Sequence, residues 1–311
     1  MSNSEMGQPQ NRTAAVAAAS WALLRLIPLS CLLAGVAVAR SQPVAGSRPA
    51  AGPLSSASAQ ALINRALANE LRAAQDSTHP MRYILHKITR HFTKTQQIVE
   101  TKDGAVARLT AVFDKPLSTD AEQQEEARLD ALSSNPGQQR HRKQSEDADT
   151  ARALKVLREL PYAFTYEYVG PADSPPGTIE KFTIKPNPDF SAPDLETEAL
   201  SQMSGQIWID PAKERVTHLE GHLDQDVDFG WGILGRLNKG GWIKIDQADV
   251  GGNQWRIIHL QMAMSGRVVF KTRVFDTTED ESAFAPVPQG LGYQQAIQML
   301  QADAPTKDAA K

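Results

Sequence analysis

Cysteine is almost absent from the 311-residue chain, in which Cys31 is the single example. Cys31 falls within an N-terminal stretch that has the pattern of an export signal, so the mature chain is expected to contain no cysteine. This absence excludes disulfide bonds, thiolate catalysis and cysteine-ligated metal sites from the folded protein.

An excess of basic residues is also missing. The chain carries 33 Lys and Arg against 36 Asp and Glu, a net charge of −3. The basic residues between positions 140 and 143 are followed directly by Glu146, Asp147 and Asp149, which is typical of a solvated helix face. The composition therefore gives no electrostatic footprint for nucleic acid.

No apolar run in the chain is long enough to be read plainly as a membrane span of about 20 residues. The nearest case follows Arg12 and Arg25, where residues 26–38 are apolar and Ala37-Val38-Ala39 offers small residues to a signal peptidase. We expect residues 1–39 to be a signal peptide and the mature protein to be periplasmic.

Two alternatives to this cleavage stay open. The apolar residues 14–24 allow an uncleaved N-terminal membrane anchor interrupted by Arg25. Acylation of Cys31 would make the chain a lipoprotein, but Pro28-Leu29-Ser30 departs from the usual sequence before an acylated cysteine.

The rest of the chain divides by composition. Residues 40–57 are rich in Ala, Ser, Pro and Gly and are expected to form a disordered linker. Residues 58–302 are expected to form one domain, followed by a polar tail at 303–311. Within the domain, helical periodicity begins at Ser58, returns in a charged insertion at about 117–160 that ends at Pro161, and recurs from Tyr293.

Strand patterns fill the remainder of the domain. They alternate apolar and polar residues and are separated by short turns, which indicates antiparallel neighbours. The predicted strands are residues 83–90, 94–101, 105–114, 162–169, 178–186, 203–210, 214–229, 242–249, 254–264 and 267–276. We therefore predict an α+β fold.

Glycines at 230, 232 and 235 match the G-x-G-x-x-G pattern of dinucleotide-binding proteins. Such a loop needs a buried strand before it and a helix that begins within it. Here Asp224, Asp226 and Asp228 precede the glycines, and only residues 236–239 separate them from Gly240-Gly241 and a new strand. The match is therefore accidental, and no cofactor is predicted.

Two metal patterns fail in the same region. The aspartates at 224, 226 and 228 start like a calcium loop, but Phe229 and Gly235 stand where glycine and glutamate are required. His218 and His222 share one face of the predicted strand 214–229, about 13 Å apart at strand spacing. We expect both histidines on a solvated face, and no metal site.

The chain contains no G-x-S-x-G, H-E-x-x-H or phosphate-loop motif, and its acidic residues do not pair in a recognisable segment. We expect a protein that is not an enzyme. A periplasmic hydrolase with carboxylates brought together from distant parts of the chain is a third interpretation.

The stretch Met203–Asp210, MSGQIWID, followed by residues 211–216, PAKERV, resembles a strand, tight turn and Arg-led strand of the LolA/LolB lipoprotein-carrier superfamily. That resemblance implies a curved antiparallel sheet forming an incomplete barrel, with helices covering its concave face and acyl chains held in its cavity. Residues 185–188 and 229–235 are also similar to stretches of uncharacterised bacterial envelope proteins.

The function predicted from this resemblance is non-enzymatic binding of an acyl chain, a lipid or a lipoprotein. The alternative is an envelope protein-interaction or stress-regulator module without a small-molecule ligand, and peripheral contact with a membrane fits either. The apolar faces of the late strands and the apolar loop 229–241 supply the predicted ligand-binding residues, which are Trp231, Ile233, Leu234, Met262 and Met264.

Overall fold

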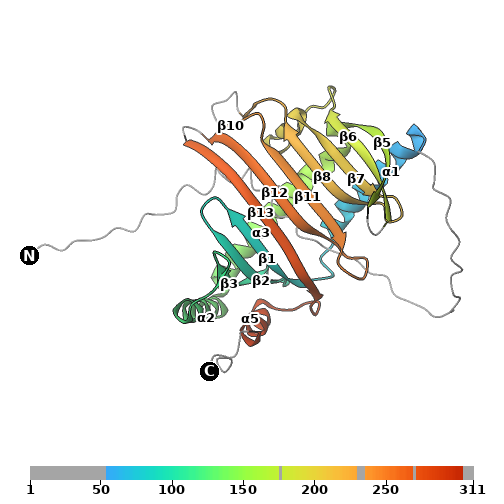
Figure 1. The fold of residues 1–311 in the computed structure, drawn as a ribbon. Helices are drawn as coiled ribbons and strands as arrows, with labels where there is room; N and C mark the ends of the chain where they lie inside the picture. Colours follow the sequence, from blue (N-terminus) through green and yellow to red (C-terminus); the bar gives the residue numbers. More distant parts are fainter. Residues whose placement is uncertain (1–53, 175–176, 230–234, 269–270, 304–311) are drawn as a thin grey trace, which may run out of the picture.

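A single open antiparallel sheet dominates the fold, and the computed structural model describes residues 54–174, 177–229, 235–268 and 271–303 (Figure 1). Eleven strands follow one another in the order β4-β3-β2-β1-β13-β12-β11-β8-β7-β6-β5, and the short strands β9 and β10 pair beside β12. The first strand, β1, thus pairs with the last, β13. The predicted α+β class with one curved antiparallel sheet is confirmed.

The strand bounds follow the alternation of apolar and polar residues. They are β1 Met81–Thr89, β2 Thr93–Val99, β3 Val106–Val112, β4 Lys115–Pro116, β5 Phe164–Ser174, β6 Gly177–Pro186, β7 Met203–Asp210, β8 Arg215–Leu223, β9 Val227–Phe229, β10 Gly235–Leu237, β11 Trp242–Asp249, β12 Trp255–Val268 and β13 Lys271–Pro286.

The register places apolar residues of neighbouring strands side by side on one face. Ile207 of β7 lies opposite Leu219 of β8, which lies opposite Ile245 of β11, and Ile245 lies opposite Leu260 of β12. Because a strand alternates its faces, the residues between them point to the other side of the sheet. This row marks the concave face.

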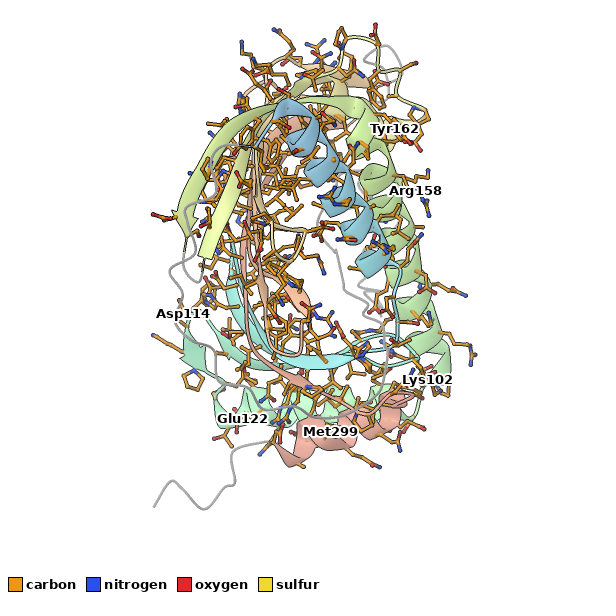
Figure 2. All side chains as sticks on the ribbon, turned by 90° about the vertical axis from the view of Figure 1, so that its right-hand side faces the viewer. Lys102, Asp114, Glu122, Arg158, Tyr162 and Met299 are labelled. Atoms are coloured by element: carbon orange, nitrogen blue, oxygen red, sulfur yellow. The ribbon has the colours of Figure 1, made fainter. Side chains whose placement is uncertain are left out.

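Two long helices lie over the concave face, as Figure 2 shows. They are α1 (Ser56–Ala74) and α3 (Pro136–Ala163), and their N-termini are capped by the side chains of Ser55 and Asn135. The apolar stripe of α1 at residues 59, 62, 63, 66 and 67 is buried against α3 and the sheet.

The other helices lie elsewhere. Helix α2 (Thr119–Ser133) and helix α5 (Tyr293–Ala302) pack with β2 and β3 at the far end of the sheet (Figure 2), and α4 (Leu195–Glu198) with the 3-10 helix η2 (Ala199–Gln202) links β6 to β7. Their apolar side chains form a second, smaller core that contains Val99, Val106, Leu129 and Ile297.

Several predicted boundaries were wrong. Strand β13 continues to Pro286, whereas the predicted strand 267–276 ends ten residues earlier. Strand 214–229 is broken after Leu223, because Asp226 accepts the backbone N–H of Lys239 and the chain turns there. The charged helix continues past Pro161 to Ala163, whose carbonyl accepts the N–H of Asn187. The predicted turn at residues 265–267 is strand, since β12 and β13 pair as far as Val268 and Lys271.

Candidate functional site

A narrow apolar cavity lies between α3 and the concave face. Its volume is about 60 Å³. The walls are apolar throughout and are formed by Ala153, Val156, Leu157, Leu160, Phe164, Ile184, Leu200, Met203, Leu219, Gly221, Ile243 and Ile245. Because no polar group faces this space, it offers nothing to hold water in place.

A second cavity of about 70 Å³ adjoins the first. The two share Leu157 and Leu160 of α3 and Leu219 and Ile245 of the sheet. The second cavity runs on beneath the C-terminal half of α1 and reaches the beginning of β12. We call the two together the apolar channel.

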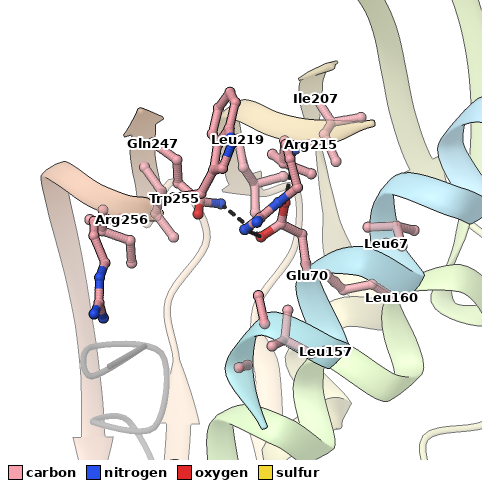
Figure 3. A pocket seen from close by; sticks show the side chains of 15 residues that line it. Leu67, Glu70, Leu157, Leu160, Ile207, Arg215, Leu219, Gln247, Trp255 and Arg256 are labelled. Atoms are coloured by element: carbon pink, nitrogen blue, oxygen red, sulfur yellow. Dashed lines mark hydrogen bonds and ion pairs between the residues drawn. The ribbon is translucent and has the colours of Figure 1, made fainter. Parts of the chain in front are cut away.

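Polar side chains stand at the α1 side of the channel (Figure 3). Glu70 of α1 is buried within the apolar stripe and accepts from Nε and Nη2 of Arg215, at 2.8 and 2.9 Å. The same carboxylate accepts the backbone N–H of Val216 at 2.9 Å, and Gln247 donates to it at 3.4 Å. This ion pair of Glu70 and Arg215, which we call the latch, attaches α1 to the beginning of β8.

Further contacts stabilise the latch, one made by Arg215 itself and others made by neighbouring residues of α1. The guanidinium of Arg215 lies over the ring of Trp255 at 5.5 Å, which is the distance of a cation–π contact. Nearer the N-terminus of α1, Nε of Arg65 donates to Oε1 of Glu214 at 2.7 Å, and the side chain of Asn69 donates to the backbone carbonyl of Glu214. Helix α1 is therefore held to the sheet by polar contacts at the residues that precede and begin β8.

A buried cation lies at the β12 end of the channel. Arg256 lines the second cavity and is 2% exposed. Its Nη2 donates to the carbonyl of His79 at 2.9 Å and lies 3.5 Å from Oε2 of Glu100. Its Nε and Nη1 are buried and have no hydrogen-bond partner among the described residues.

Two carboxyl groups near Arg256 have raised pKa values. Burial raises the pKa of Glu100 to about 7, although Arg256 and the N–H of Met81 oppose the shift. Burial, followed by the charges of Glu279 and Glu100, raises the pKa of Glu281 to about 8. Both groups therefore hold a proton over part of the neutral pH range, whereas a guanidinium stays charged.

A larger polar cavity continues the path beyond Glu100. Its volume is about 360 Å³, and Ala74 at the end of α1 lines both this cavity and the apolar channel. Glu100, Lys102, Lys143 and Glu146 are among its walls. Along the concave face, the apolar channel is thus followed by the surroundings of Arg256 and then by the polar cavity of about 360 Å³.

The predicted ligand-binding residues are placed only in part. Trp231, Ile233 and Leu234 lie outside the described residues. Met262 and Met264 are buried on β12 at 2% and 7% exposure, in the same core cluster as the channel residues but not on its walls. Their role in ligand binding stays a prediction.

The expectation of a solvated face was wrong for His218. This residue is 3% exposed, and its Nδ1 lies 2.5 Å from Oδ1 of Asp246. Its ring packs against Trp208 at a tilt of 31°, with centroids 4.1 Å apart. His222 is exposed, as predicted. In the described ranges, no three His, Cys, Asp or Glu residues are grouped so that they could hold a metal ion.

Sequence reasoning missed the polar residues of the site. Glu70 left a signal, because it stands at the helical position where the stripe of Ala66 and Leu67 continues, and a carboxylate there needs a buried partner. Nothing in the sequence marks Arg256 as a site residue, since a single charged residue at the start of a strand is ordinary. Glu100 lay inside a predicted strand, 94–101, with nothing in the sequence to mark it as buried.

Comparisons with known proteins give one likeness of fold. No protein-family model matches the chain, and no curated protein matches its sequence. Among solved structures, it is similar to a domain from Vibrio parahaemolyticus assigned to outer membrane lipoprotein sorting, with a TM-score of 0.27 and 11% identity. The match covers 71% of this chain and 91% of that one.

None of the helices in the described ranges combines the length and apolar composition that crossing a bilayer requires.

Proposed function

We propose that this protein binds an acyl chain of a lipid or lipoprotein in the periplasm, without a chemical step. One observation carries the proposal, namely the apolar channel between α3, α1 and the concave face of the sheet. Each methylene removed from water into such a space contributes about 0.8 kcal/mol, so a chain of many methylenes gains binding energy without specific contacts.

Binding of a long chain requires the channel to widen. An engineered apolar cavity of about 150 Å³ accepts a molecule of the size of benzene, whereas the two cavities here measure about 60 and 70 Å³. We infer that helix α1 is the element that moves, because it covers the second cavity and its polar attachment there is the Glu70–Arg215 latch to β8.

The alternative function is a protein-interaction module of the cell envelope whose interior is filled by its own side chains. The small volume of the channel favours it, since ordinary ligand sites measure about 300–1,000 Å³. The two functions differ in whether the protein takes up a neutral acyl compound.

The experiment is uptake of methyl palmitate by the mature protein, purified from a periplasm and freed of lipid, measured by native mass spectrometry and by displacement of a fluorescent acyl probe. We expect stoichiometric binding to the wild type and loss of binding in Leu219→Phe, which narrows both cavities. Val169→Phe is the matched control, because Val169 is exposed on β5.

Circular dichroism would establish that Leu219→Phe is folded, since overpacking costs about 1–3 kcal/mol. If that variant fails to fold, Ala153→Leu narrows the first cavity by a smaller amount. A wild-type protein that stays free of ester at saturating concentration would exclude acyl binding and leave the interaction module as the working function.

A further inference from the structure

The buried guanidinium of Arg256 has more donors than the protein satisfies. Of its three nitrogens, Nη2 contacts the carbonyl of His79 and the carboxyl of Glu100, while Nε and Nη1 contact no described acceptor. A buried charged donor without an acceptor is costly, because it has given up its hydration without replacement. Its neighbour Glu100 likewise keeps one unpartnered oxygen, Oε1.

The position of Arg256 connects two kinds of space. On one side it lines the apolar channel, where Figure 3 shows its side chain pointing away from the Glu70–Arg215 latch. On the other side its partner Glu100 lines the polar cavity of about 360 Å³. A molecule with an apolar chain and a polar end would therefore place the junction of the two at Arg256.

The charges around Arg256 decide which polar end fits. They include Tyr83 of β1, Glu100 after β2, Asp76 after α1 and Glu281 of β13. Glu70 and Arg215 line the same cavity as Arg256 but are paired with each other. Glu146 of α3 acts on Glu100, and Glu279 acts on Glu281 but is itself paired with Lys87.

Protonation removes most of the negative charge near the guanidinium. The pKa of Glu100 is raised to about 7 and that of Glu281 to about 8 by burial, and burial also raises the pKa of Tyr83. Asp76 stays ionised, because, although burial opposes the shift, hydrogen bonds from Thr78 and His79 lower its pKa. On the acid side of the Glu100 and Glu281 values, Asp76 is therefore the carboxylate that remains among the groups acting on Arg256. Protonated carboxyl groups can also donate hydrogen bonds, so this site presents donors and a positive charge.

We propose that Arg256 binds the carboxylate of a single-chain fatty acid whose hydrocarbon chain lies in the apolar channel. The inference rests on the proposed function and narrows its ligand class. A carboxylate supplies the acceptors that Nε and Nη1 lack, and its charge is compensated by the guanidinium. A neutral ester or alcohol supplies weaker acceptors and no charge.

Affinity for the acid should depend on pH in a defined direction. As pH rises through about 7 and about 8, Glu100 and Glu281 lose their protons and repel the bound carboxylate. Affinity for palmitate should therefore fall over this range, whereas affinity for methyl palmitate should stay constant. Binding of palmitate should also be accompanied by proton uptake.

The test compares palmitate with methyl palmitate on the lipid-free mature protein, by displacement of a fluorescent acyl probe below and above these pKa values. On the acid side we expect the wild type to prefer palmitate by at least about tenfold, as a charge-assisted hydrogen bond provides. The preference should disappear in Arg256→Gln, because palmitate loses more affinity than the ester does. Arg273→Gln, at an exposed position on β13, is the matched control.

Because Arg256→Gln leaves Glu100 without its cationic neighbour, the double variant Arg256→Gln with Glu100→Gln serves if the single variant does not fold. Equal affinity of the wild type for acid and ester, or a preference that persists in the folded variants, would overturn the role of Arg256 while acyl binding stands. A wild type that binds neither compound would remove the proposed function itself.

Discussion

At the scale of single residues, the close approach of strands β7 and β8 requires a glycine at position 205. Gly205 lies in the stretch Met203–Asp210 and pairs with Gly221 of β8. A Cβ atom at position 205 would lie 1.9 Å from the backbone oxygen of Glu220, a distance that only backbone movement can relieve. The glycine in this motif is thus required by β7–β8 packing.

We expect Gly205→Ala to lower the free energy of unfolding by roughly 3 kcal/mol, the upper range for overpacked positions, or to prevent folding. Urea denaturation followed by circular dichroism measures the change. Gly177→Ala is the control, because no atom lies within 4 Å of the added Cβ. Equal stability of the two variants would show that β7 and β8 separate at little cost.

The same scale shows where the sequence stops being informative. The apolar residues of the channel follow strand and helix periodicity. Alternation in the predicted strand 214–229 and helical spacing in the charged insertion put Leu219 and Val156 on apolar faces, and both line the channel. Arg256 and Glu100 belong to no periodic pattern. They meet because β12 and the end of β2 both approach the segment around His79 to Met81, and only the folded chain brings these segments together.

At the scale of elements, α1 is fastened at the site where the channel would open. The Glu70–Arg215 latch is buried and bidentate, whereas the Arg65–Glu214 pair on the same helix is partly exposed. Removing one partner of a buried pair costs far more than removing one partner of an exposed pair, which contributes about 0–1 kcal/mol. The latch therefore dominates the attachment of this end of the helix.

We expect Glu70→Gln to raise the rate of acyl uptake severalfold and to reduce stability, because the bidentate pair loses its charge. Removing one partner of a buried pair costs up to about 3–5 kcal/mol, and Gln retains part of the hydrogen bonding. Stopped-flow mixing with a fluorescent acyl probe gives the rate. Arg65→Gln is the control, and an unchanged rate in Glu70→Gln would mean that α1 is not the element that opens.

Element prediction succeeded where a single period continued without interruption. The bounds of β7 match the predicted strand, and helix α1 begins at Ser56, two residues before the predicted start. Prediction failed where a local hydrogen bond overrode the pattern, as at Asp226, whose carboxylate ends the strand that alternation alone would continue.

At the scale of the whole molecule, the carboxyl groups inside the sheet link stability to pH. The folded chain keeps protons on Glu100 and Glu281 up to about pH 7 and 8, while the unfolded chain releases them in the ordinary glutamate range. The folded state thus binds more protons in this window. The contribution of these two groups to the free energy of unfolding is greatest on the acid side and falls as pH rises through the two values.

Each such proton contributes a slope of at most about 1.4 kcal/mol per pH unit. We expect Glu281→Gln to flatten the decline between pH 5 and pH 8, because the amide resembles the protonated acid. Urea denaturation over a pH series measures the slope. Glu167→Gln, at an exposed position on β5, should leave it unchanged, and an unaltered slope in Glu281→Gln would mean that Glu281 ionises as it does in water.

The connectivity of the sheet has a consequence for the order of folding. Strands β1 to β4 join the remaining strands only through β13, which is the last strand of the chain. Contacts between segments so distant in sequence form slowly, because a long loop must close first. During synthesis or export, the β1–β4 portion and the β5–β12 portion of the sheet can form separately. They cannot join until β13 has emerged and can pair with both β1 and β12. A chain stopped before residue 271 would present two unpaired strand edges to its neighbours, which is the state most exposed to aggregation.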